Sequence, residues 1–387
     1  MGMERKKLKQ KLFLIILIIL IMLVLIQVYK NIDFLRNRNN LGKASFEKAY
    51  HNELQQLRKK GVIVKEINKN KDYGLYVVHL KETLRLGEEK SGHIFSLVGG
   101  VAIDKDENIY VLETKEGRVL KFNKHGKYLF SFGRKGKGPK ELLFATSMIL
   151  GKNNNLYILC SGTRRIAEFT LKGEFIRTIP VFELRGLPFS FTEDRSGNFY
   201  ICFYSEKLNT VVHKYNTDGK LVKSFVSPVP FLKPLSNMER GLIPNMSNGY
   251  ILIDDNDIIF SRSNPYEINF YSTDGVLKRR LYRKSELMPF PKVEKHGKTI
   301  TFHMPVYSEF IGMIDDNLLH CTCVPPGNIP EDIGAVFEII DPNGQLLATK
   351  KIKEQFYVIA LDRDNIYVFD HSSFLLYRYK ISIEKMR

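Results

Sequence analysis

The sequence predicts an all-β fold, a six-bladed β-propeller of four-stranded blades, and three observations support the prediction. A unit of four short strands recurs from residue 100 onward, at intervals of 43 to 60 residues. A glycine turn precedes the fourth strand of most copies, and the last copy stops after three strands, close to the end of the chain. Small sheets that repeat at this spacing bury their faces only against their neighbours, which is the arrangement of a propeller.

The second strand is the most regular part of the unit, in segments such as "NNLYILC", "GNFYICF" and "DNIYVFD". Its central core position falls at Tyr110, Tyr157, Tyr200, Ile259, Leu319 and Tyr367. The turn before the fourth strand ends in glycine, which adopts the positive φ that tight hairpin turns require. These turns contain Lys172-Gly173, Asp218-Gly219, Asp274-Gly275 and Asn343-Gly344. Six copies therefore predict six blades.

The amino-terminal end predicts a membrane anchor. Residues 1–11 form a basic tail, and residues 12–29 are an uncharged, apolar run. Eighteen helical residues span roughly 27 Å, about one hydrocarbon core. A cleavable signal peptide has small residues soon after its apolar region, whereas the first ones here are Gly42 and Ala44. We therefore expect an uncleaved single-pass signal-anchor, with the propeller outside the cytoplasm, in the periplasm or at the cell surface.

Residues 30–73 are expected to form a stalk or linker. The stretch "SFEKAYHNELQQLRKKG" has apolar residues at helical spacing and ends in Gly61, which predicts an amphipathic helix. Residues 74–387 are then the propeller. Because the sixth copy has only three strands, we expect Gly74–Gly87 to supply its fourth strand, which closes the ring and removes an open sheet edge.

Composition narrows the function classes. The net charge of +17 is compatible with an anionic partner or with a solvated basic coat, and a membrane anchor makes nucleic acid the least expected partner. Four cysteines are too few for a disulfide framework. Cys321 and Cys323 are two apart on an expected strand and share a face, so they are either small buried hydrophobes or a weak metal or redox pair.

The first copy of the repeat indicates a family. The segment "GGVAIDKDENIYVLETKEGRVLKFNKHGKYLFSFGRKGKGPKEL" resembles the NHL repeat, including its inter-blade "G-x-G-P-x-E" segment. The absence of tryptophan excludes the Trp-Asp signature of another propeller class. With the membrane-targeting end and the leading "LRLGE" strand, the chain resembles the bacterial family of six-bladed β-propeller proteins with NHL-like repeats. This resemblance implies a fold and says almost nothing about chemistry.

Loop lengths predict which face of the propeller binds a ligand or partner. Strands alternate in direction, so the turns between second and third strands and the blade-to-blade connections emerge on one face, the connection face. Three long segments adjoin blades 4 and 5 there, and they contain ten of the fifteen prolines: Val226–Asn248, Arg283–Glu309 and Thr322–Ala335. Proline reduces the freedom of a loop before binding. The loops are either a preorganised recognition surface or caps that pack on one another.

We expect a ligand or partner to contact the connection face, at basic and aromatic positions. A basic rim there favours a protein, a peptide or an anionic glycan. The positions proposed for this contact are Arg134, Lys137, Arg164, Arg165, Arg240, Arg262, Phe290, His303, Tyr307 and His371. The expected role is therefore a binding or scaffold module.

The alternative is an enzyme. The resemblance implies it, because some related propellers are lyases or lactonases with a metal in the central channel, but the inner strands here carry few groups able to bind one. No Gly-x-Ser-x-Gly elbow or His-Glu-x-x-His helix is present. The run "SFGRKGKGPKELLF" spaces two glycines as a P-loop does, yet Pro139 stands where the lysine is needed. We therefore expect no catalytic residues, no cofactor and no metal, and we interpret that run as a connection between blades.

Overall fold

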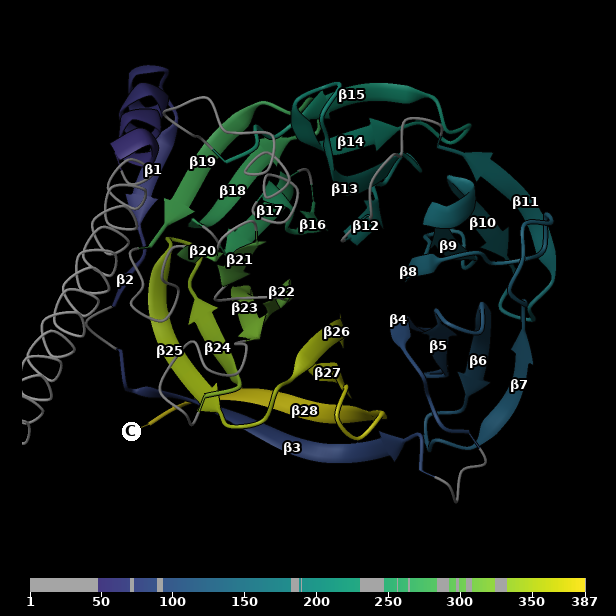
Figure 1. The fold of residues 1–387 in the computed structure, drawn as a ribbon. Helices are drawn as coiled ribbons and strands as arrows, with labels where there is room; N and C mark the ends of the chain where they lie inside the picture. The colour runs from purple at the N-terminus through teal and green to yellow at the C-terminus, as the bar shows by residue number, and fades with distance from the viewer. Residues whose placement is uncertain are drawn as a thin grey trace, which may run out of the picture. The chain divides into compact units, whose positions relative to one another are not determined.

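The computed structural model describes most of the chain after residue 47. The residues described are 48–69, 73–88, 93–181, 188, 190–229, 247–255, 257–263, 265–283, 292–296, 299–303, 308–323 and 333–386. They divide into two units, one holding residues 48–53, 292–296 and 299–302 and the other holding the rest. The second unit is a ring of six β-sheets (Figure 1). The predicted six-bladed propeller is confirmed.

Each sheet is one blade of antiparallel strands in chain order, except the last. Blade 1 consists of β4 (Val98–Ile103), β5 (Ile109–Glu113), β6 (Arg118–Phe122) and β7 (Tyr128–Phe132). Blade 2 consists of β8 (Ala145–Leu150), β9 (Leu156–Cys160), β10 (Arg165–Phe169) and β11 (Phe175–Pro180), with the short 3-10 helix η2 (Ser161–Thr163) between its second and third strands. Blade 3 consists of β12 (Ser190–Glu193), β13 (Phe199–Ser205), β14 (Thr210–Tyr215) and β15 (Leu221–Phe225).

The second half of the ring repeats this plan. Blade 4 consists of β16 (Tyr250–Asp254), β17 (Asp257–Ser263), β18 (Tyr266–Ser272) and β19 (Leu277–Tyr282). Blade 5 consists of β22 (Ser308–Ile314), β23 (Asn317–Cys323), β24 (Ala335–Ile340) and β25 (Gln345–Ile352). Blade 6 consists of β26 (Tyr357–Asp362), β27 (Asn365–Asp370), β28 (Leu375–Lys385) and β3 (Tyr76–Leu86). The first strand of each blade contacts the first strand of the next, and β26 contacts β4 to close the ring.

The ring is closed as the sequence predicted, by a strand from the amino-terminal side. Strand β3 pairs antiparallel with β28 along nearly its whole length, from Leu86 opposite Leu376 to Tyr76 opposite Lys385. Blade 6 thus combines the two ends of the propeller in one sheet. An unpaired β28 would present an open row of backbone groups, which strand β3 satisfies.

Two further strands come from residues that the sequence placed in the linker. Strand β1 (Ile63–Glu66) runs parallel to β19 at the outer edge of blade 4, and β2 (Asn68–Lys69) runs parallel to β25 at the outer edge of blade 5. Between them, Ile67 is 2% exposed, and its N–H donates to the Tyr282 carbonyl at 2.7 Å. We call residues 63–69 the strap. It joins two neighbouring blades from outside.

The core lies between the blades. Within the described residues there are six apolar clusters, and each spans one junction between neighbouring blades. Second strands such as Leu156–Cys160 are therefore buried on both faces, and all five of their residues are buried. The predicted core positions of the second strands, from Tyr110 to Tyr367, are likewise at most 3% exposed.

Two elements complete the description. A helix covers residues 48–59 and is followed by Gly61 at φ +82°, as the amphipathic pattern predicted. A two-stranded sheet, β20 (Lys292–His296) with β21 (Thr299–His303), lies within Arg283–Glu309, which the sequence treated as a loop. The expected anchor, residues 12–29, lies outside the described residues. None of the helices in the described part of the chain has the length and hydropathy needed to cross a bilayer.

Candidate functional site

The face opposite the connection face, which we call the turn face, is built from tight turns that hold themselves rigid. In the five turns between third and fourth strands, the side-chain oxygen of the first residue accepts a backbone N–H four residues further on, at 2.7 to 3.2 Å. These first residues are Asn123, Thr170, Asn216, Ser272 and Asp341. Short polar side chains of this kind satisfy turn backbones. The glycine four positions into each turn has φ between +70° and +83°, as predicted.

The same turns lock neighbouring blades together. A cationic side chain of the preceding blade donates to the carbonyl of the second turn residue at five junctions, for example Arg279 to Pro342 at 2.7 Å and Arg378 to Lys124 at 3.2 Å. The other three contacts are Lys121 to Leu171, Arg177 to Thr217 and Lys214 to Thr273. Blade 6 has no such turn, because its third and fourth strands come from opposite ends of the propeller. Part of the large positive charge therefore has a structural use.

The acidic residues of the turn face are turn formers, and Asp104 is an example. Its carboxylate accepts the backbone N–H groups of Asp106 and Asn108 and the hydroxyl of Tyr110, at 2.9 to 3.0 Å. Burial works to raise the pKa of Asp104, but the hydrogen bonds from Asn108 and Tyr110 outweigh it and lower the pKa. In blade 2 the carboxylate comes instead from Glu168, which accepts the Tyr157 hydroxyl at 3.0 Å. These groups are occupied within the fold.

On the connection face, the glycine-rich run between blades 1 and 2 folds around its own carboxylate. Glu141 Oε2 accepts the Gly138 N–H at 2.8 Å, and Glu141 Oε1 accepts Arg134 Nε at 2.8 Å. Arg165 Nη2 donates to the Glu141 carbonyl at 2.8 Å. The hydrogen bond from Gly138 is the main cause that lowers the pKa of Glu141. A carboxylate of the chain thus occupies the donor that a phosphate would need.

The predicted contact residues differ in exposure, and some of them lie outside the described part of the chain. Arg134, Lys137, Arg164 and His371 are exposed. Arg165 is half-buried, and its guanidinium donates to carbonyls of the blade 1–2 connection. Three predicted positions, Arg240, Phe290 and Tyr307, lie outside the described residues. His303 ends strand β21, and its side chain also lies outside the described part.

The prediction that Arg262 lies on an accessible rim is wrong. Arg262 is 1% exposed and pairs with Glu267 at 2.6 Å across the β17–β18 hairpin. Glu267 is also 3.2 Å from Arg280, so two guanidinium groups share one carboxylate between blades 3 and 4. Arg262 Nη1 donates to the Ser227 carbonyl at 3.1 Å, just after β15. The charge is buried because this partner on the hairpin neutralises it.

A second buried polar group lies between blades 4 and 5, and it was not predicted from the sequence. Glu338 accepts the Tyr266 hydroxyl at 2.7 Å and pairs with Arg283, and His320 Nδ1 lies 3.8 Å away. Burial works to raise the pKa of Glu338, but His320 and Arg283 lower it overall. Arg262 and Arg283 therefore hold the chain where two of the long proline-rich segments begin, near Ser227 and at Arg283 itself.

Two exposed phenylalanines on the connection face were also missed. Phe144 is 58% exposed with φ +48°, and Phe374 is 44% exposed with φ +58°. Positive φ is unfavourable for a bulky side chain. Phe374 precedes the third strand of blade 6, at the turn position that Gly117 and Asn209 fill in blades 1 and 3, also with positive φ. Comparing these turns in the sequence would have shown the unusual residue.

Groups suited to a metal do not converge in the described part of the chain, where no three His, Cys, Asp or Glu residues are arranged to hold one. Cys321 and Cys323 are each 2% exposed. Burial raises the pKa of Cys323 to about 11 and that of Cys321 well above its ordinary value, so both thiols stay protonated near neutral pH. They are small buried groups of blade 5.

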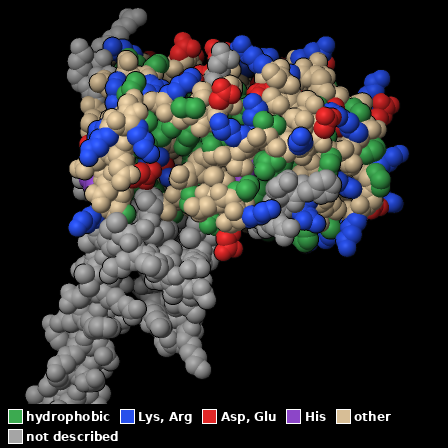
Figure 2. All heavy atoms as spheres, turned by 90° about the horizontal axis from the view of Figure 1, so that it is seen from above, with side chains coloured by type: hydrophobic (Ala, Val, Ile, Leu, Met, Phe, Trp, Pro, Cys, Tyr) green, Lys and Arg blue, Asp and Glu red, His purple; other side chains and the backbone are tan. Residues whose placement is uncertain are grey.

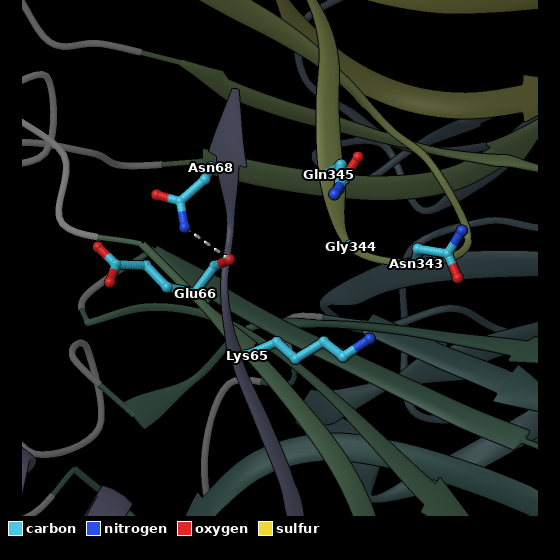
Figure 3. A pocket seen from close by; sticks show the side chains of 6 residues that line it. All are labelled: Lys65, Glu66, Asn68, Asn343, Gly344 and Gln345. Atoms are coloured by element: carbon cyan, nitrogen blue, oxygen red, sulfur yellow. Dashed lines mark hydrogen bonds between the residues drawn. The ribbon is translucent and has the colours of Figure 1, made fainter. Parts of the chain in front are cut away.

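A shallow pocket lies on the outside of blade 5, between the strap and the turn before β25 (Figure 3). Its volume is about 510 Å³, and it is lined by Lys65, Glu66, Asn68, Asn343, Gly344 and Gln345. The lining is polar, and Asn68 donates to the Glu66 carbonyl at 3.4 Å. The side of the ring seen in Figure 2 shows Lys and Arg side chains at many separate places, with acidic groups among them. That side has no single basic patch.

Comparison with known proteins agrees with this architecture. Residues 95–239 match the family described as 6-bladed beta-propeller. A segment of 109 residues is 28% identical to Protein brain tumor of Drosophila melanogaster, covering 28% of this chain and about a tenth of that protein's length. The predicted likeness to six-bladed propeller proteins is confirmed, while the finer likeness to NHL repeats stays a prediction.

Two solved structures share the fold. A candidate exported protein of Bacteroides fragilis has a TM-score of 0.54 and 11% identity, covering 84% of this chain and all of the other. A member of the DUF4221 family from Bacteroides vulgatus has a TM-score of 0.51 and 10% identity, covering 80% of this chain and 99% of the other. At such identities the likeness shows the fold alone.

Proposed function

We propose that this chain is a membrane-anchored, extracytoplasmic β-propeller that binds a protein, a peptide or an anionic glycan through its connection face. The observation that supports the proposal is the contrast between the two faces. On the turn face, side chains and backbone groups are used to stiffen turns and to join blades. On the connection face, exposed arginine, lysine and phenylalanine side chains stand on the turns and connections of blades 6, 1 and 2. Two buried ion pairs hold the chain beside blades 4 and 5, where two of the long segments begin.

This contrast is typical of a binding scaffold. Binding residues accumulate on loops that a rigid framework positions. Arg262 and Arg283 each pair with a buried carboxylate, at 1% and 19% side-chain exposure. Removing one partner of a buried ion pair costs about 3–5 kcal/mol, so these contacts fix the chain near Ser227 and at Arg283, where two of the long segments begin. The membrane location rests on the apolar run at residues 12–29 and the basic tail before it.

The proposal is tested by capturing a ligand in intact cells with the full-length chain. A photo-crosslinking residue at Lys137 on the connection face should give a discrete adduct. The same residue at Asp218, an exposed position of a turn on the opposite face, is the matched control. Adducts from the Asp218 position alone would overturn the proposal. Stoichiometric zinc or calcium in the purified chain would favour the channel-metal enzyme instead.

A further inference from the structure

Four exposed apolar side chains lie on the connection face of blades 6, 1 and 2. Ile94 is 59% exposed and Leu97 is 39% exposed, just before β4, and they accompany Phe144 and Phe374. Hydrogen bonds hold Leu97 and Phe144 to neighbouring turns of their own blades. The Leu97 carbonyl accepts the Thr114 N–H at 2.9 Å, and the Phe144 carbonyl accepts the Ser161 N–H at 3.0 Å. We call these four residues and the turns that carry them the blade 6–1–2 surface.

Both aromatic rings stand where the backbone is unfavourable for them. A Cβ atom at Gly162 would lie 2.8 Å from Phe144 Cδ2, so the glycine leaves room for the ring. A Cβ atom at Gly87 would lie 2.9 Å from the Phe374 carbonyl. Left-handed φ costs an ordinary residue roughly 1–2 kcal/mol, and residues kept in such conformations concentrate at functional sites. Both residues are also exposed, so core packing does not account for them.

Basic side chains are concentrated on the segments of blades 1 and 2 within this surface. The turn Glu113–Arg118, the connection Gly133–Phe144 and the segment Cys160–Arg165 together carry eight basic residues and three acidic ones. Two of the acidic residues are occupied, Glu113 by Arg118 at 2.7 Å and Glu141 by Arg134 at 2.8 Å. Lys115, Lys135, Lys137 and Arg164 are exposed. The surface therefore offers uncompensated positive charge next to apolar side chains.

We infer that the blade 6–1–2 surface binds an acidic, extended polypeptide segment whose apolar side chains contact Phe144, Phe374, Ile94 and Leu97. This deepens the proposed function and rests on it. Aromatic and arginine side chains are the usual anchors of protein interfaces, with polar groups around an apolar centre. Exposed basic side chains on blades 1 and 2 lie on the same face as the exposed apolar ones. In an extended segment that alternates acidic and apolar residues, the two kinds of side chain point to opposite sides, so a strand lying edge-on presents acidic groups on one side and apolar groups on the other.

The test uses the full-length chain in detergent and labelled peptides of about 12 residues, which span about 40 Å when extended. One peptide alternates Glu with Leu, a second alternates Glu with Ser, and a third alternates Lys with Leu. Fluorescence anisotropy should show that the Glu–Leu peptide binds at least about tenfold more tightly than either of the others. Its affinity should fall as salt rises from about 0.05 to 0.5 M, because solvent-exposed charges are screened.

The decisive variant is Phe144→Asn with Phe374→Asn, because asparagine tolerates positive φ and should leave the fold intact. It should weaken binding of the Glu–Leu peptide about tenfold or more. The matched control is Ile176→Asn with Val222→Asn, which changes two apolar residues of the outer strands that are 42% and 56% exposed. That control should leave the affinity unchanged, and a thermal melt of each variant should confirm folding.

Several outcomes would overturn the inference. They are an unchanged affinity in the Phe144 and Phe374 variant, and equal binding of the Lys–Leu peptide. A third outcome is that the wild-type chain does not bind the Glu–Leu peptide but binds phosphatidylglycerol vesicles, and that the variant loses this vesicle binding. That result would assign the surface to a membrane. A fourth outcome is that the wild-type chain self-associates without binding the peptide, and that the variant does not self-associate. That result would assign the surface to contact with a second copy of the chain. In any of these cases a ligand crosslinked at Lys137 would still support the proposed function, so the two failures are distinguishable.

Discussion

Stability should depend on pH through His213, which is buried within blade 3. The side chain is 0% exposed, and its ring is packed on Phe203 with centroids 4.1 Å apart. Nε2 donates to the Phe203 carbonyl at 3.0 Å, so in this tautomer Nδ1 accepts the Ser224 hydroxyl at 2.8 Å. The neutral ring is therefore satisfied, and burial is the main cause that lowers the pKa of His213 to about 4.

The direction and size of the change in unfolding free energy follow from the difference between the pKa of His213 in the folded and in the unfolded chain. Unfolded, the ring titrates near pH 6.5, so below that pH the unfolded chain binds a proton that the folded chain does not. The stabilisation is complete above pH 6.5 and is lost as pH falls from 6.5 toward 4. Between about pH 7.5 and pH 5 this one group should remove about 2 kcal/mol from the free energy of unfolding. Most carboxylates remain ionised in that window.

The assay is urea unfolding at several pH values, for the wild-type chain and for His213→Gln. Glutamine keeps an amide donor but does not titrate in this range. Between the two pH values, the free energy of unfolding should therefore fall by about 2 kcal/mol less for the variant than for the wild-type chain. His125→Gln is the matched control, because it makes the same substitution at an exposed position, in the turn after β6. An identical pH dependence for wild type and His213→Gln would refute the reasoning.

Two other predictions concern how the ring is held together. Deleting Gly74–Gly87 should leave β28 unpaired, lower the melting temperature and promote aggregation; a monomer with an unchanged melting temperature in light scattering and calorimetry would contradict closure by β3. Ile67→Ala should cost about 2–5 kcal/mol in urea unfolding, because its side chain is buried between blades 4 and 5, whereas Ile63→Ala, at 54% exposure, should cost far less. Equal losses for the two variants would mean that the strap does not join those blades.

The sequence was informative where the repeat is regular. Each copy carries the same strand pattern and a glycine turn, so the blades, the core tyrosines and the closing strand β3 could be predicted. The strap could not. Its strands are two to four residues long and parallel to their partners, so neither a turn residue nor an alternating pattern marks them. Its burial depends on Ile67 alone, which a single sequence does not distinguish from an ordinary linker residue.

That the connection face is the site of recognition stays a prediction, and the structure changes what is expected of individual residues on it. Arg262 looked like a rim residue because arginine is usually exposed, yet Glu267 lies directly opposite it on the hairpin. That pairing was in principle readable from the short turn between β17 and β18. Phe374 was missed because a phenylalanine in a turn looks like any apolar residue. Its meaning depends on the left-handed backbone of that position, which comparison with Gly117 and Asn209 in the corresponding turns would have indicated.

The central claim, that recognition uses the connection face, is tested most directly by mapping a ligand captured in cells onto both faces. Photo-crosslinking residues would be placed at Lys137 and Arg164 on the connection face, and at Asp218 and Lys172 on the turn face, all of them exposed. We predict the same discrete adduct from the first pair and none from the second. Adducts confined to Asp218 and Lys172 would contradict the claim and assign recognition to the face of tight turns.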